Sequence, residues 1–159
     1  MDLKFIDSAK ELFNKNKDTG VATALTATWI VAAMKGTHLK LYETKKSSQF
    51  ADYILVGTFS NPTQASAMSQ QIIKTLKQFD VPLRALEGQN DSDWILIDMY
   101  DVIVHLFSES ARQLYALDEL LAAYRPLEIP QEFYTASNDT ILEELEMTKK
   151  ATEDFKNYF

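Results

Sequence analysis

The side chains of this protein that are best suited to chemistry are carboxylates and aromatic rings, because the chain contains no cysteine and only two histidines. Disulfides, thiol nucleophiles and cysteine-rich zinc sites are therefore excluded, and a histidine-based metal site would need several carboxylates. Asp91 and Asp93 could hold Mg²⁺ while residues 57–60 cradle a phosphate, as nucleotidyl transfer requires. However, the two carboxylates follow Gly88-Gln89-Asn90, an ordinary turn composition, and no third carboxylate accompanies them. We therefore predict no catalytic residue, no cofactor and no metal, and keep nucleotidyl transfer as an alternative.

A second set of residues falls on two predicted strands, residues 94–99 and 101–107. So few residues separate these strands that only an antiparallel hairpin can join them. Strand alternation gives the hairpin one wholly aliphatic side, which we interpret as core, and another side that mixes Trp, Asp, His and Phe. Such a mixture is unusual in a core and common in a binding surface. The predicted surface comprises Trp94, Asp98, Asp101, His105 and Phe107.

Taken singly, these residues are equally consistent with a structural role. Trp94 and Phe107 could pack beneath a helix, and His105 could make a satisfied hydrogen bond within its strand. Phe107 is the residue that we most expect to belong partly to the core. The grouping of several such side chains on one side of the hairpin is what favours a binding surface.

The elements that must position this hairpin are predicted from hydrophobic periodicity and capping residues. Helices are predicted over residues 3–13, 19–36, 61–79 and 108–124, with a last helix from about Thr140, and strands over residues 38–42, 53–57, 83–87, 94–99 and 101–107. The helix over 108–124 is indicated by the spacing of Ala111, Leu114, Tyr115, Leu120 and Leu121. Strand, helix and strand in succession favour a parallel crossover. We therefore predict an α/β fold with a mixed β-sheet of about five strands and flanking helices.

Composition and charge indicate one folded domain with extensions. The chain has 159 residues, 46% of them hydrophobic, and a net charge of -7. We predict a helical extension and linker over residues 1–20, an α/β domain over 21–125, and an acidic, helical extension over 126–159, where eight acids face three lysines. This charge disfavours direct binding to nucleic acid and favours a basic protein partner.

No membrane segment is predicted. The most apolar window, residues 21–34, is too short to span a bilayer, which takes about 20 residues, and threonines interrupt it. The first turns contain Asp2, Asp7 and Glu11, unlike a signal or transit peptide, and we therefore predict a cytoplasmic protein.

Several short motifs occur in an order and spacing that resemble the ribosomal silencing factor family, also called Iojap or RsfS. They are Ala51-Asp52-Tyr53, Glu87-Gly88, the run from Asp93 to Asp98, the run from Asp101 to Phe107, and Arg112 with Tyr115, Leu117 and Leu120. The similarity covers roughly residues 22–121, and its most specific part is the hairpin from Trp94 to Phe107 followed by Arg-x-x-Tyr-x-Leu. The resemblance implies a nucleotidyltransferase-like topology without catalysis.

The resemblance also implies a function. Members dock on the large ribosomal subunit through its universal protein fourteen, a basic protein, and sterically prevent the two subunits from joining, which represses translation. Trp94, Asp98, Asp101, His105 and Phe107 are the expected docking residues, with Asp52, Tyr53 and Glu87 as weaker candidates. In this reading Trp94 is the apolar anchor, and the aspartates orient a basic partner. A homodimer that pairs two copies of the hairpin is the other alternative.

The chain departs from the family pattern at the hairpin turn and near two other motifs. Met99 and Tyr100 occupy the turn where many members have an aromatic residue and a glycine, so we expect a turn without positive φ. The segment 57–60 is one residue longer than usual, and Leu121 stands where a tryptophan is typical.

Overall fold

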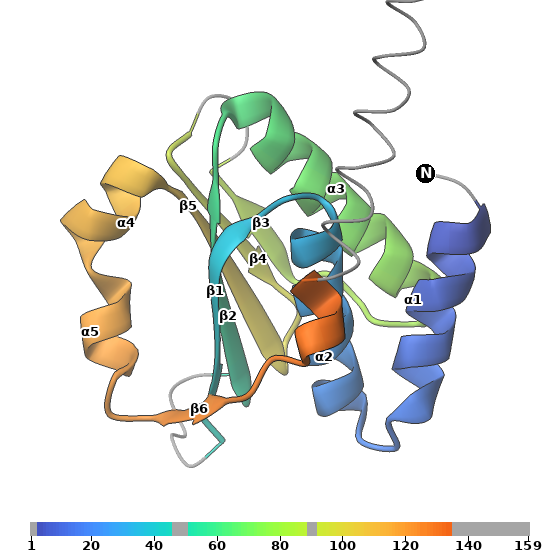
Figure 1. Ribbon diagram of the computed structural model, residues 1–159. Helices are drawn as coiled ribbons and strands as arrows, with labels where there is room; N and C mark the ends of the chain where they lie inside the picture. Colours follow the sequence, from blue (N-terminus) through green and yellow to red (C-terminus); the bar gives the residue numbers. More distant parts are fainter. Residues whose placement is uncertain (1–2, 46–50, 89–91, 135–159) are drawn as a thin grey trace, which may run out of the picture.

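The computed structural model describes residues 3–45, 51–88 and 92–134. Its centre is a six-stranded mixed sheet in the order β3-β4-β5-β2-β1-β6 (Figure 1). The strands are β1 (Thr37–Glu43), β2 (Tyr53–Phe59), β3 (Ala85–Glu87), β4 (Trp94–Asp98), β5 (Val102–Ser108) and β6 (Arg125–Leu127). Strands β2 and β5 are parallel, and every other neighbouring pair is antiparallel. The predicted mixed α/β fold is therefore confirmed, with one strand more than expected.

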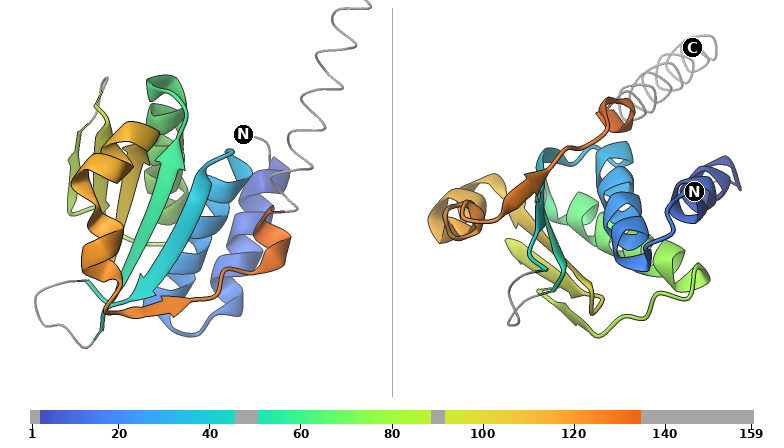
Figure 2. Two further views of the ribbon diagram at one scale, coloured as in Figure 1. Left: turned by 60° about the vertical axis from the view of Figure 1, so that its left-hand side comes forward. Right: turned by 90° about the horizontal axis from the view of Figure 1, so that it is seen from below.

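Helices cover the two faces of the sheet unequally. Figure 2 shows α1 (Leu3–Lys15), α2 (Thr19–Ala33) and α3 (Pro62–Gln78) on one side, and the short α4 (Glu109–Tyr115) and α5 (Leu117–Leu121) on the other. We call the side that packs against α2 and α3 the inner face and the opposite side the outer face. None of the helices in the described part of the chain is long and apolar enough to cross a membrane.

The inner face carries the main core. Leu55, Ile97, Val104 and Leu106 are completely buried there, against α2 and against Met68 and its neighbours on α3. Helix α2 is buried on almost every side because α1 packs over it, and its small alanines and threonines allow this close approach. Asp18 caps α2 by accepting hydrogen bonds from the amides of Gly20 and Val21, one residue before the predicted start of this helix.

Helix α3 begins as its sequence predicts. Asn61 accepts a hydrogen bond from the Gln64 amide at 2.8 Å, Pro62 occupies the first turn, and the Gln64 side chain accepts from the Ser60 amide. The crossover from β2 through α3 reaches β3, which runs parallel to β2 with β4 and β5 between them. The predicted parallel crossover is therefore present between strands that are not neighbours.

Two local predictions are wrong. The hairpin turn places Tyr100 at φ 68°, and the Asp101 amide donates to the Met99 carbonyl across it, so this non-glycine residue takes the left-handed conformation that we did not expect. The helix over 108–124 is broken at Ala116, whose φ of 49° separates α4 from α5. Leu114 and Leu120, two of the apolar residues that indicated this helix, are 77% and 73% exposed.

The chain beyond residue 125 also differs from the sequence-based picture. Residues 125–127 form β6 at the edge of the sheet, where the missing amide of Pro126 is tolerated, and Phe133 packs into the core. The segment after Leu121 is thus held by the domain as far as residue 134. The helix predicted from Thr140 lies outside the described residues.

Candidate functional site

The outer face changes from buried to accessible across the sheet. Helices α4 and α5 cover β1, β2 and part of β5, where Ile54, Val56 and Phe107 are buried beneath Ala111 and Leu121. They leave the other end of the face uncovered. We call this uncovered region the open strip; it comprises Glu87, Trp94, Leu96, Asp98 and Ile103, of which Glu87 is exposed and the other four are half-buried. Cross-strand pairing places Glu87 beside Leu96 and Asp98 beside Ile103 on this face.

An aromatic cluster forms the boundary between the covered region and the open strip. The Trp94 ring lies 5.0 Å from that of Phe107 and 4.8 Å from that of Tyr115, measured between ring centroids. Phe107 is fully buried below, whereas Tyr115 on α4 is 52% exposed. Trp94 therefore rests on a rigid base and presents part of its indole to the outside.

His105 fixes the orientation of the indole. The Trp94 Nε1–H donates a hydrogen bond to Nδ1 of His105 at 3.0 Å, so Nδ1 carries no proton and the ring is neutral. His105 is 8% exposed, and this burial lowers the pKa of its imidazole from 6.5 to about 4. The structure thus places His105 under the surface as a support for Trp94, rather than on the surface itself.

The acidic residues gather at the other end of β4. Asp98 accepts a hydrogen bond from the Tyr100 amide at 3.0 Å, and its carboxylate lies 3.9 Å from Nε of Arg84. Asp101 is exposed in the same turn, and its carbonyl accepts from the Tyr53 amide at the start of β2. Asp52, which is half-buried, immediately precedes Tyr53. Asp98 and Asp101 therefore mark an acidic end of the open strip, with Asp52 nearby.

Two predicted residues belong elsewhere. Tyr53 is 2% exposed on the inner face, where its ring is so close to α2 that a Cβ on Gly20 would lie 3.1 Å from it. Phe107 is completely buried, as its expected partial core role anticipated. Of the eight candidates, Trp94, Asp98, Asp101 and Glu87 are accessible together on or beside the open strip.

Three further residues of this region were not among the predicted docking residues: Leu96 and Ile103, which belong to the open strip, and Tyr115, which adjoins it. Alternation alone places Leu96 and Ile103 on this side, so a signal for them was present.

Arg112 is the residue that sets the boundary of the open strip. Its guanidinium binds the Asp118 carboxylate in a bidentate manner, at 2.9 Å and 3.1 Å, and donates to the Thr58 hydroxyl and to the His38 carbonyl. The Asp118 carboxylate also accepts from the Tyr42 hydroxyl. Partial burial raises the pKa of Asp118, but the hydrogen bonds and charge of Arg112 outweigh this and hold it below its usual value. Arg112 therefore fastens α4 and α5 to β1 and β2.

The described structure contains only part of the enzymatic alternative. Asp91 lies outside the described residues, and Asp93 is exposed just before β4. Gly57 lies within β2, where a Cβ would come 3.0 Å from Leu39 and 3.3 Å from Val31, so its role is close packing of the inner face. Within residues 3–45, 51–88 and 92–134, no group of three His, Cys, Asp or Glu side chains is placed to hold a metal ion.

Fold and site together define a mixed α/β domain with a partly uncovered outer sheet face. The model of the family described as "Ribosomal silencing factor during starvation" matches residues 17–157, a longer span than the motifs indicated. The protein named "Ribosomal silencing factor RsfS" of Haemophilus influenzae is 32% identical over 89 residues, which are 56% of this chain and 87% of that protein. The chain belongs to this ribosomal silencing factor family.

Two other comparisons are more distant. The mouse protein named "Mitochondrial assembly of ribosomal large subunit protein 1" is 25% identical over 75 residues, which are 45% of this chain and 33% of the mouse protein. A crystal structure of a protein from Chromobacterium violaceum superposes with a TM-score of 0.57 at 20% identity, over 82% of this chain and 98% of that chain. This likeness bears on the fold alone.

Proposed function

We propose that this protein binds the large ribosomal subunit in the cytoplasm, through the subunit's universal protein fourteen, and represses translation by sterically preventing subunit joining. The observation that carries the proposal is the open strip, an accessible band of apolar and acidic side chains built on the hairpin that bears the most specific family motif. Membership of the ribosomal silencing factor family supports the ribosome as partner. The name of the mouse relative supports the large subunit.

The chemistry of the open strip suits a basic protein. Trp94, Leu96 and Ile103 provide an apolar centre, which a partner can remove from water at about 25 cal/mol per Å². Asp98 and Asp101, at one end, and Glu87, at the edge, supply negative charge around it. Such charges mainly speed encounter and fix orientation, so binding should weaken as the salt concentration rises. The proposed activity is occupation of a surface, and it requires no chemical reaction.

Removing the anchor tests the proposal. We expect Trp94→Ala to weaken cosedimentation with purified large subunits at least about tenfold, or about 1.4 kcal/mol, because it deletes the largest apolar side chain of the strip. Trp94→Ala also removes the packing of the indole on Phe107 and Tyr115. Leu96→Ala therefore provides a second variant, at a half-buried residue of the strip that is not part of this aromatic cluster. Leu96→Ala should weaken binding by about fivefold.

Leu120→Ala is the matched control, because it makes the same Leu→Ala change at a 73% exposed position on α5, which packs over β1 and β2. It should bind as the unchanged protein does. Circular dichroism establishes that each variant is folded. Folded Trp94→Ala and Leu96→Ala variants that cosediment normally would remove the strip from the interface. If light scattering shows that the free protein is a dimer and it does not cosediment with large subunits, the homodimer is favoured instead.

A further inference from the structure

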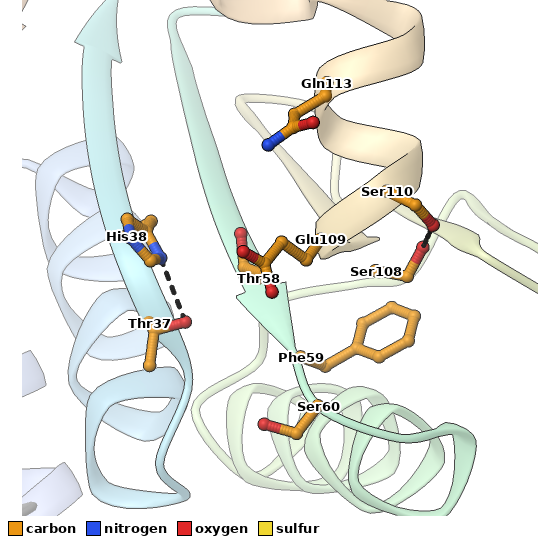
Figure 3. A pocket seen from close by; sticks show the side chains of 9 residues that line it. All are labelled: Thr37, His38, Thr58, Phe59, Ser60, Ser108, Glu109, Ser110 and Gln113. Atoms are coloured by element: carbon orange, nitrogen blue, oxygen red, sulfur yellow. Dashed lines mark hydrogen bonds between the residues drawn. The ribbon is translucent and has the colours of Figure 1, made fainter.

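A pocket lies where the two parallel strands of the sheet end. From the carboxyl end of β2 the chain passes to α3 at the inner face, whereas from the neighbouring end of β5 it passes to α4 at the outer face. Because the two connections diverge, they leave a crevice at the strand ends, the place where open α/β sheets commonly bind ligands. Here the crevice is a pocket of about 560 Å³, within the usual range for small-molecule sites (Figure 3).

Hydroxyl groups dominate the lining of this pocket. Five of its nine lining residues carry one: Thr37, Thr58, Ser60, Ser108 and Ser110. The Thr58 oxygen accepts a hydrogen bond from Arg112 at 2.9 Å, which leaves its own proton to be donated. A pocket lined in this way offers both donors and acceptors, as a ligand rich in hydroxyl groups requires.

Two longer polar side chains reach into the pocket from α4. Figure 3 shows Glu109 and Gln113 extending from this helix toward Thr58 and His38. Within the described part of the chain, neither side chain has a hydrogen-bond or ion-pair partner. A carboxylate and an amide at such positions can accept from adjacent hydroxyls of a ligand, while the amide also donates.

The charge of the pocket selects against phosphate. Glu109 is its carboxylate, and no lysine or arginine is among the residues that line it in the described structure. The nearby Arg112 is already bound to Asp118. Glu109 would therefore repel a phosphorylated ligand, and Lys40 and Arg112 line the adjoining pocket rather than this one, so a neutral ligand is favoured.

We infer that this pocket is a binding site for a neutral sugar ring, free or within a nucleoside, whose hydroxyls bind Glu109, Gln113 and the surrounding hydroxyl groups. The site is separate from the open strip, so its occupancy can be measured without ribosomes. The pocket lies at the start of α4, the helix that ends at Tyr115, so a bound small molecule would contact this helix.

Saturation-transfer NMR and titration calorimetry on the full chain test the inference, with D-ribose, adenosine and adenosine 5′-monophosphate as probes. Ribose or adenosine should bind saturably, and the two arms distinguish the free sugar from the nucleoside. The monophosphate should bind more weakly than adenosine. Glu109→Ala and Gln113→Ala should each weaken binding, the former about tenfold because hydrogen bonds to a charged group are the stronger ones.

Glu119→Ala is the control, since Glu119 is an exposed carboxylate on α5 that does not line the pocket. It should leave binding unchanged. The inference is overturned if neither ribose nor adenosine binds, if the monophosphate binds more tightly than adenosine, or if Glu109→Ala and Gln113→Ala bind as well as Glu119→Ala does.

Discussion

The two faces of the sheet are built from the same strands but are used differently. On β4, Ile95 and Ile97 point to the inner face and are 3% and 0% exposed, whereas Trp94, Leu96 and Asp98 point outward and stay half-buried. The inner face is covered by long helices, and the outer face only partly by two short ones. Apolar side chains that the fold leaves uncovered contribute little to stability, so their presence on the open strip is better explained by binding.

Neighbouring residues of β4 provide the largest expected contrast between the faces. Ile97→Ala should lower the free energy of unfolding by about 3–4 kcal/mol, because it opens a cavity in a fully buried core. Leu96→Ala should cost only about 1 kcal/mol, because the half-buried side chain leaves space that water can fill. Urea denaturation measures both values. Equal losses would show that the outer face is as important to stability as the inner one.

Acid should lower the free energy of unfolding through His105, which lies on the outer face. Its imidazole has a pKa of about 4 in the folded protein, against 6.5 when unperturbed. Between these values the unfolded chain binds a proton that the folded chain does not, so stability falls as the pH drops from about 6.5 to 4. Each pKa unit corresponds to about 1.4 kcal/mol, and the expected loss is therefore about 3 kcal/mol.

The comparison for this prediction is His105→Gln, which can still accept from the Trp94 Nε1–H but does not titrate. Denaturation between pH 7 and pH 4 should show a steeper decline in the unchanged protein than in this variant. Parallel pH profiles would indicate that His105 is protonated as readily in the folded state as in the unfolded one.

The smallest expected contrast concerns the two arginines of the outer face. Arg112→Lys should cost about 1.5 kcal/mol, because lysine cannot reproduce the bidentate contact with Asp118 and the further bonds to β1 and β2. Arg84→Lys should cost less than about 0.5 kcal/mol, since Arg84 is 63% exposed and lies 3.9 Å from Asp98. Both changes keep the charge. Similar unfolding free energies for the two variants would contradict the role assigned to Arg112.

Local patterns were sufficient for much of the fold. Strand alternation assigned Ile95 and Ile97 to the core and Trp94 to the opposite side, because side chains of a strand alternate whatever surrounds it. Asn61 and Pro62 located the start of α3, because capping depends on residues within one turn. The ordered motifs indicated the ribosomal silencing factor family, and the family model matches the chain.

Other features depended on distant contacts. Three residues around Pro126 carry too weak a pattern to predict β6, and they form a strand only because the edge of β1 is there to pair with them. Ala116, where the helix breaks, and Tyr100, in the hairpin turn, both adopt a positive φ although neither is glycine. Sequence rules expect a positive φ mainly at glycine, so they did not predict these two positions.

The sequence by itself determined which side chains lie on each side of the hairpin, and hence the residues from which a binding surface could be made. Tertiary structure alone decided how many of them remain accessible. Arg112 draws α4 over β2 through contacts with residues more than fifty positions away, which buries Phe107 and leaves Trp94 at the boundary. Periodicity describes the direction of a side chain, but burial depends on what packs above it, and here the covering helices are held by contacts that span the fold.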